Sequence, residues 1–129
     1  MNLLLDTHIF IWMGSEPAKL PIPIANILRN PEHALFLSIA SVWEMQIKVG
    51  LGKLHLPANV ETFVTTFCQL NTIASLPIAQ AHIWTLATLP QHHRDPFDRL
   101  LIAQAIAEDY TLVTADPLFT PYPAKLMMT

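Results

Sequence analysis

Four carboxylates could work together as a metal-binding or catalytic set, although they are spread along the chain as Asp6, Glu44, Asp98 and Asp116. Oxygen ligands of this kind suit Mg²⁺ or Mn²⁺. Clustered carboxylates repel one another and take up protons, and a divalent cation removes that repulsion. Such a cation can make hydroxide from water near neutral pH and stabilise the charge that develops on a phosphate during hydrolysis. The question is whether the fold brings the four acids together.

The elements that must position these acids alternate between strand and helix along the chain. This alternation predicts an α/β fold with a parallel sheet of about four to five strands and helices on its faces, and residues 1–129 are expected to form one domain. We expect strands at 2–5, 34–38, 72–77, 111–115 and 124–128, and helices at 7–13, 24–30, 38–50, 59–70, 78–89 and 96–108.

Simple geometry then places the acids at one edge of the sheet. The helix at 97–108 climbs about 18 Å and the strand at 111–115 descends about 16 Å, so Asp98 and Asp116 return to the same level. Asp6 directly follows the first strand, and Glu44 lies in the second turn of the helix after the strand at 34–38. Ligands of open parallel sheets bind at the carboxyl ends of the strands. All four acids are therefore expected at that edge.

Local structural roles compete with this interpretation for the first two acids. Asp6 could simply be the N-cap of the next helix. Glu44 could complete a capping box with Ser41, or pair with Lys48 one turn later. The capping box requires the helix to begin at Ser41, and we expect it to begin earlier, near Ser38.

The acids around the last long helix carry similar alternatives. Asp95 is expected as the N-cap of that helix, with Pro96 as its first residue, and it could pair with Arg99. It is also a possible fifth member of the acidic set. Arg99 could instead contact a phosphate of the substrate. Asp116 could start a short helix over 117–119.

Histidines and tryptophans are expected to have other roles. His8 is expected as a neighbour of the site, and His92 and His93 as solvated loop residues, because no zinc-binding spacing is present. The three tryptophans fall at mostly apolar helical positions, which favours packing in the core or at an interface over base stacking: Trp12, Trp43 and Trp84.

The net charge of −3 does not by itself suggest a nucleic-acid-binding protein. Setting aside the four acids leaves six acidic against seven basic residues, a balance of +1, which is compatible with a phosphate backbone. No apolar run approaches the roughly 18 residues that a membrane span needs. The start of the chain lacks the basic residues of a signal peptide, and the lone Cys68 excludes an internal disulfide, so a cytoplasmic location is expected.

Four segments in order resemble the successive motifs of PIN-domain nucleases, and most closely those of the toxin ribonucleases of VapBC-type toxin–antitoxin systems. They are "LLLDTHIFIW", "SVWEMQIKVGLGKL", "HHRDPFDRLLIAQA" and "TLVTAD". The resemblance implies a three-layer α/β/α sandwich and a Mg²⁺- or Mn²⁺-dependent endoribonuclease. It also implies a homodimer, and a cognate antitoxin encoded alongside that masks the activity.

The same resemblance assigns residues to the site. Asp6, Glu44, Asp98 and Asp116 fall on the acidic quartet of the family, where they would bind the metal that activates water. Thr114 falls where a hydroxyl residue commonly supports the site, Asp95 competes with Asp98 for the third acidic place, and Arg99 is a further candidate.

Three other functions remain open on the sequence. A PIN-type DNA nuclease would use the same chemistry, and a catalytically silent PIN-fold interaction module would keep the fold alone. A phosphatase of the haloacid-dehalogenase type is disfavoured, because it needs a second aspartate two residues after the first, where this chain has His8.

Overall fold

A parallel sheet forms the centre of the protein. The computed structural model describes residues 1–91 and 95–128. Within these residues, five strands lie in the order β3-β2-β1-β4-β5, and every neighbouring pair is parallel. The strands are β1 (Asn2–Leu5), β2 (Ala34–Ser38), β3 (Ile73–Leu76), β4 (Thr111–Val113) and β5 (Lys125–Met127).

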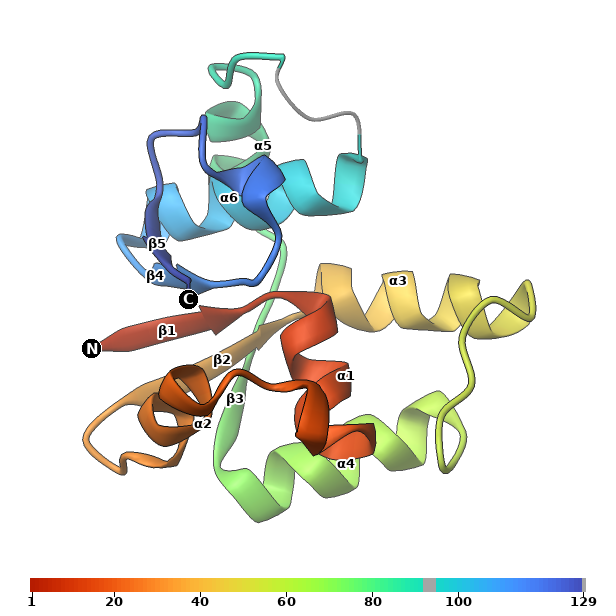
Figure 1. The fold of residues 1–129 in the computed structure, drawn as a ribbon. Helices are drawn as coiled ribbons and strands as arrows, with labels where there is room; N and C mark the ends of the chain where they lie inside the picture. Colours follow the sequence, from red (N-terminus) through yellow and green to blue (C-terminus); the bar gives the residue numbers. More distant parts are fainter. Residues whose placement is uncertain (92–94, 129) are drawn as a thin grey trace.

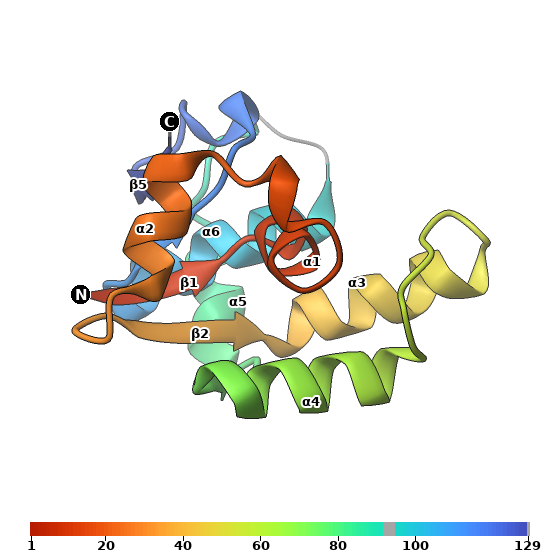
Figure 2. The ribbon, with the colours of Figure 1, turned by 60° about the horizontal axis from the view of Figure 1, so that its bottom comes forward.

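Helices cover both faces of this sheet (Figures 1 and 2). Figure 1 shows α5 and α6 on one side of the strands, and α1, α2 and α4 on the other. The helices are α1 (Thr7–Ser15), α2 (Ile22–Arg29), α3 (Ile39–Gly50), α4 (Val60–Asn71), α5 (Gln80–Leu86) and α6 (Pro96–Glu108), with short 3₁₀ turns η1 (Pro17–Lys19) and η2 (Pro117–Phe119). This is the expected α/β/α sandwich.

The central strands are apolar on both sides because each side faces a helical layer. Leu3 and Leu5 of β1 pack into one core cluster, with Phe10 and Phe63 from α1 and α4. Leu4, which points the other way, packs into a second cluster with residues of α6 and β4. The continuous apolar run at 3–5 is therefore what a doubly covered strand requires. Among the residues that the structure describes, no helix is both long and apolar enough to cross a membrane.

The strand order reverses direction at β1. The chain proceeds from β1 to β2 and β3 on one side, and returns to place β4 and β5 on the other side. Adjacent connections therefore diverge between β1 and β4, and open α/β sheets bind ligands at the carboxyl ends of their strands at such a point.

The element boundaries agree closely with the sequence-based predictions. The strand at 34–38 and the helix at 96–108 are confirmed, with Asp95 as N-cap and Pro96 as first helical residue. Ser38 caps α3 by accepting a hydrogen bond from the Ala40 N–H at 3.0 Å. Ser41 lies inside that helix, so the capping-box interpretation of Glu44 is wrong.

Several predicted elements are longer than the observed ones, including the strands predicted at 72–77 and 124–128, which are observed as Ile73–Leu76 and Lys125–Met127. The strand at 111–115 ends at Val113, because the Thr114 side chain turns to Asp6 and accepts the Asp116 N–H. The helix predicted at 78–89 occupies only Gln80–Leu86.

A buried glutamine fixes the position of α6 against its neighbours. Gln104 is fully buried in the middle of α6, and its Oε1 accepts a hydrogen bond of 2.6 Å from the Ser38 hydroxyl. Its Nε2 donates to the Pro77 carbonyl at 3.3 Å and lies 3.3 Å from Nδ1 of His82, which is also buried. His82 Nε2 in turn lies 2.9 Å from Oε1 of Glu108. These polar contacts connect α6 with the cap of α3 and with α5.

Candidate active site

Asp6 lies where β1 passes into α1, at the carboxyl ends of β1 and β4. Its own N–H donates to the Val113 carbonyl at 2.9 Å, which extends the pairing of the two strands by one residue. The carboxylate is only 2% exposed, and its Oδ1 accepts the His8 N–H at 3.2 Å as the N-cap of α1. The capping role considered from the sequence is therefore real, but it uses one oxygen only.

Thr114 connects Asp6 with Asp116. The Thr114 hydroxyl is fully buried, donates to Asp6 Oδ2 at 2.6 Å and accepts the Asp116 N–H at 3.0 Å. The Asp116 carboxylate accepts the Leu118 N–H at 2.9 Å and so caps η2, as its sequence position allowed. One hydroxyl thus ties the acid after β1 to the backbone of the acid after β4.

Glu44 is held by partners on two elements. It is 2% exposed, its Oε1 lies 2.7 Å from the Thr7 hydroxyl, and its Oε2 accepts a hydrogen bond of 2.8 Å from Lys48 Nζ. The Thr7 hydroxyl also lies 2.8 Å from the Ser41 hydroxyl. Because each hydroxyl has one proton, all three groups are satisfied when Ser41 donates to Thr7 and Thr7 donates to Glu44.

Thr7 and Ser41 were missed in the sequence analysis. Both are buried, and they join α1 to α3 across 34 positions of the chain. Their only sequence signals are that Thr7 directly follows Asp6 and that Ser41 lies one helical turn before Glu44.

Asp98 shows that the acids share one electrostatic environment. Burial raises the pKa of Asp98 to about 8, and the negative charges of Asp95, Asp6, Glu44 and Asp116 add to this rise. Charges affect one another in this way only at short range through a poorly solvated medium. The charges of the other three acids and of Asp95 thus act on Asp98, and Asp95 Oδ1 accepts the N–H groups of Phe97 and Asp98 at the start of α6.

Two further pKa values describe the same site. Burial raises the pKa of Asp6, with the charge of Glu44 adding to it, although the Thr114 hydrogen bond and the neighbouring His8 act in the opposite direction. Burial alone would lower the pKa of Lys48, but the hydrogen bond and charge of Glu44 outweigh it, helped by Asp95 and Asp98, so the pKa is raised. Lys48 is therefore a stable cation beside the acids.

The carboxylates of the site are suitable ligands for a divalent metal, although they do not form a complete coordination site as they stand. Within residues 1–91 and 95–128, no three His, Cys, Asp or Glu side chains stand close enough together to hold an ion as they are. The groups present are nevertheless oxygen donors, which hard cations prefer, and two of them have pKa values raised by burial and mutual repulsion. A cation would offset that repulsion.

Arg99 holds the chain near the start of α6. Its Nη1 donates to the Pro90 carbonyl at 2.7 Å and to the Tyr122 hydroxyl at 3.3 Å. His8 is largely exposed, with Nδ1 4.0 Å from Asp6 Oδ1, which agrees with its predicted place beside the site. The predictions for His92 and His93 lie outside the described residues.

The tryptophans differ from one another. Trp12 is partly buried and packs against the core cluster that contains Leu3 and Phe10. Trp43 and Trp84 are 58% and 65% exposed, so neither packs in the core, and the alternative of packing at an interface stays a prediction for both. Their periodic placement in helices had the same pattern as that of a core residue, because helical periodicity does not reveal which faces remain uncovered.

Comparisons with known proteins agree with this fold. The chain matches the family described as the PIN domain over residues 3–124. It is 29% identical over 119 residues to Ribonuclease VapC22 of Mycobacterium tuberculosis, a match that spans 89% of this chain and 87% of the relative.

Solved structures give the same result. The structure superposes on a chain of VapBC2 from Rickettsia felis, bound to a DNA fragment from the promoter, with a TM-score of 0.76 and 18% identity over 99% of this chain and 98% of the other. A chain of DNA-bound VapBC from Salmonella typhimurium gives a TM-score of 0.69 with 16% identity over 99% and 98%. The predicted PIN-like fold is confirmed.

Proposed function

The chain belongs to the PIN domain family, and on that premise we propose that it is a Mg²⁺- or Mn²⁺-dependent endoribonuclease, the toxin of a toxin–antitoxin pair. The observation that carries the proposal is the burial of the Asp6 and Glu44 carboxylates, each 2% exposed, at the carboxyl ends of the strands; burial and the charges of four other carboxylates also raise the pKa of Asp98 to about 8. Such a concentration of negative charge at the strand edge of an α/β sheet is costly without a cation, and it suits a metal-dependent hydrolase.

The residues proposed to hold the metal are Asp6, Asp98 and Asp116, with Glu44 at its border. When bound, the metal would supply an activated water and stabilise negative charge on the phosphodiester. Glu44 already pairs with a cation, since Lys48 Nζ donates to its Oε2 at 2.8 Å, so we assign it to the outer part of the site.

The chain's own side chains then orient these acids. Thr114 holds Asp6 Oδ2, which leaves Oδ1 directed toward the start of α1. The hydroxyls of Thr7 and Ser41 keep Glu44 as an acceptor, and Lys48 supplies a fixed positive charge for a nearby phosphate of the substrate.

The biological assignment rests on relatives. The relative from M. tuberculosis is named a ribonuclease, and similar folds were solved as VapBC assemblies and as a toxin–antitoxin complex from Klebsiella pneumoniae. We therefore propose RNA as the substrate, a cognate antitoxin protein as the partner, a homodimer as the assembly and the cytoplasm as the location, with residues 1–129 acting as one domain.

Cleavage of RNA tests this proposal. Purified protein, freed of antitoxin, is incubated with single-stranded and structured RNA in Mg²⁺, Mn²⁺ or EDTA, and we expect cleavage only with the metals. Asp6→Asn should reduce the rate by roughly 100-fold or more, since loss of a ligand costs more than loss of a supporting contact.

A matched substitution controls for removal of an acid as such. Asp109→Asn removes an exposed carboxylate that pairs with Lys125 at 2.6 Å, and asparagine tolerates the left-handed backbone there (φ 58°). It should cut RNA as fast as the parent. If Asp6→Asn also cuts RNA as fast as the parent, the assignment of the site is wrong.

Cleavage of single-stranded DNA but not of RNA in the same assay would support the DNA nuclease instead. Absence of both cleavage and metal binding would support a silent module.

A further inference from the structure

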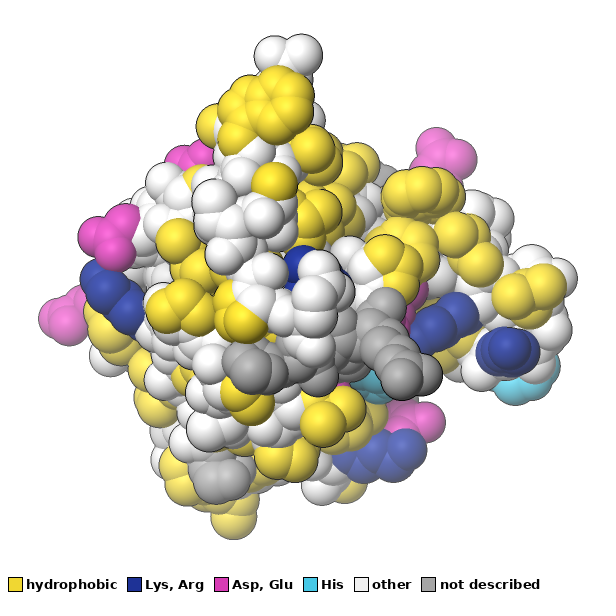
Figure 3. Space-filling view, turned by 90° about the horizontal axis from the view of Figure 1, so that it is seen from above, with side chains coloured by type: hydrophobic (Ala, Val, Ile, Leu, Met, Phe, Trp, Pro, Cys, Tyr) yellow, Lys and Arg dark blue, Asp and Glu magenta, His cyan; other side chains and the backbone are white. Residues whose placement is uncertain are grey.

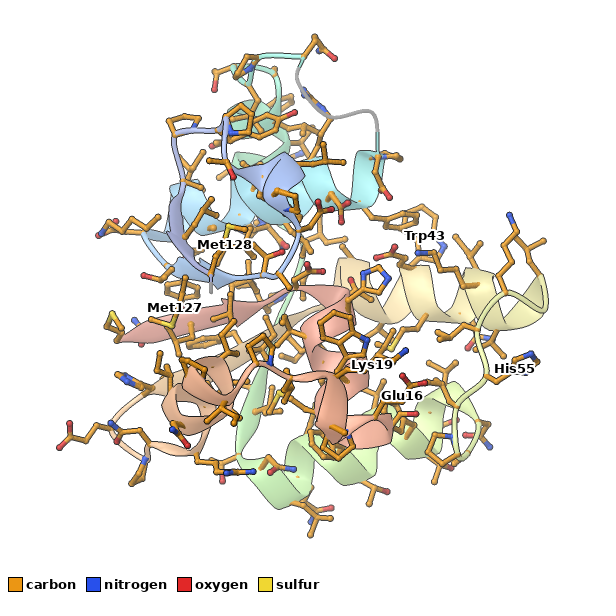
Figure 4. The ribbon with its side chains drawn as sticks, viewed as in Figure 1. Glu16, Lys19, Trp43, His55, Met127 and Met128 are labelled. Carbon is orange, nitrogen blue, oxygen red and sulfur yellow. The ribbon has the colours of Figure 1, made fainter. Side chains whose placement is uncertain are left out.

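Two aromatic side chains stand next to two acids of the proposed site. Trp43 precedes Glu44 on α3, and Phe97 precedes Asp98 on α6. Their rings meet edge to face, with centroids 5.1 Å apart and planes at 79°. Figure 4 shows Trp43 on α3 beside the first turn of α6. The two helices that carry Glu44 and Asp98 thus join in one aromatic surface at the border of the acids.

The Trp43 ring of this pair is exposed. It keeps 58% of its surface open to solvent, whereas Phe97 is partly buried. The Phe97 ring packs against the indole edge to face and so restricts its orientations. Large exposed aromatic surfaces of this kind are common where proteins contact ligands.

We propose that Trp43, braced by Phe97, is the stacking surface for an unpaired base next to the phosphodiester held at the acids. The inference rests on the proposed ribonuclease function. Single-stranded RNA is bound largely by stacking of its bases on aromatic side chains, which every base permits because each has a flat π face. An uncharged base is also not repelled by the neighbouring carboxylates, while Lys48 lies one turn further along α3 for a phosphate.

A protein partner is the competing occupant. Hydrophobic side chains are visible along α3 in the view from above (Figure 3), and the exposed ones follow at four-residue spacing: Ile39, Trp43, Ile47 and Leu51. The base is favoured because Trp43 differs from the three aliphatic residues. It alone has an aromatic partner on α6, Phe97, which directly precedes Asp98 in the sequence.

The affinity for RNA, measured in a variant that does not cleave, tests the stacking surface independently of cleavage. In the full-length Asp6→Asn protein with Mg²⁺, the affinity for a fluorescent single-stranded RNA oligonucleotide is measured by anisotropy. Adding Trp43→Ala should weaken binding about 10-fold, within the range found for loss of one base–aromatic stack. Trp43→Phe, which keeps a ring, should recover most of the affinity. Trp84→Ala, which removes an equally exposed tryptophan from α5, should change it less than twofold.

A second variant separates stacking from general apolar contact. Trp43→Leu keeps apolar bulk but has no π face, so stacking predicts a loss close to that of Trp43→Ala. Retained RNA affinity in Trp43→Leu and Trp43→Ala overturns the proposal. If the same variants also change the elution volume of the protein in size-exclusion chromatography, the surface is a protein interface.

Abasic RNA gives a readout that does not depend on any variant folding. In the parent protein, removal of one base beside the cleaved bond should lower kcat/KM about 10-fold, and in Trp43→Phe by less. No sensitive position within two nucleotides of the bond overturns the proposal. If the parent binds RNA through Trp43 but cuts none, the ribonuclease function fails and the stacking surface stands.

Discussion

The two edges of the sheet differ in what they bury. At the carboxyl ends of the strands, the molecule buries Asp6 and Glu44 to 2% exposure and surrounds them with hydroxyls and Lys48. At the amino ends lies a groove of about 890 Å³ between α2, α4 and the start of β2. Its lining is mainly apolar, with residues such as Met13, Leu28 and Phe67, and it contains no cluster of acids.

The difference shows that a large hollow need not be the site of the chemistry. The groove is shaped by apolar side chains that stabilise the fold through burial. The acidic edge does the opposite, since burying carboxylates with raised pKa values costs free energy of folding. Proteins tolerate that cost where the buried groups have a function. Shifted pKa values therefore identify the proposed site more directly than the volume of a cavity does.

Asp98→Asn provides the strongest test of this contrast. The substitution should lower RNA cleavage by roughly 100-fold or more, and at the same time stabilise the metal-free protein at pH 8. The expected gain is about 1–2 kcal/mol, reduced from the full electrostatic cost because Asp98 is not fully buried. Thermal unfolding of both proteins, followed by circular dichroism in EDTA, measures it.

The raised pKa of Asp98 also predicts how the stability of the folded protein changes with pH. The pKa of Asp98 is about 8 in the folded protein and near 4 in the unfolded chain, so the folded state binds the extra proton between these values. Stability of the parent should therefore fall as pH rises from about 4 to 8, and the gain from Asp98→Asn should shrink toward pH 4. Mg²⁺ should stabilise the parent more than the variant at pH 8. A variant that is less stable than the parent at pH 8 would contradict the proposed cost.

Thr7→Val should have a smaller effect at the same edge. It removes the hydroxyl that lies 2.7 Å from Glu44 and keeps the shape of the side chain, so we expect about a 10-fold loss of activity. The loss should fall on kcat rather than KM, because the contact positions Glu44 and does not touch the substrate. Thr7→Ser keeps the hydroxyl and should stay within a few-fold of the parent. Equal losses in the two variants would mean that packing, and not the hydrogen bond, is responsible.

Leu70→Asn should have the smallest effect and tests the other edge. Leu70 lines the groove and is 77% exposed, so its replacement should change stability by less than about 0.5 kcal/mol. RNA cleavage should remain within twofold of the parent in the same assay. A tenfold loss would show that the groove takes part in the reaction, and the separation of the two edges would then fail.

The sequence allowed much of the fold to be predicted, because its signals are local. The apolar runs at 2–5 and 34–38 fit strands covered on both faces, and Asp95-Pro96 marks the start of α6. The convergence of the acids was predicted from element lengths alone and stays a prediction, while the charges of Asp6, Glu44 and Asp116 do contribute to the raised pKa of Asp98.

The contacts that orient the acids could not be predicted in the same way. Thr7 meets Ser41 only because α1 packs against α3, and no periodic pattern reports which side chains meet between two helices. The exposure of Trp43 was missed for a related reason, since an apolar residue on an uncovered helix face has the same sequence pattern as a core residue. Local propensity was sufficient for the elements, whereas tertiary packing decided the details of the site.

The buried hydrogen bond of Gln104 restricts how α6 can move relative to α3. Because this buried amide accepts from Ser38, a sliding of α6 by a single residue would replace it with an alanine, either Ala103 or Ala105, and strand the hydroxyl without an acceptor. The buried amide therefore fixes the position of α6 relative to α3. As a result, Asp98 and Glu44 stay in a fixed relation to each other.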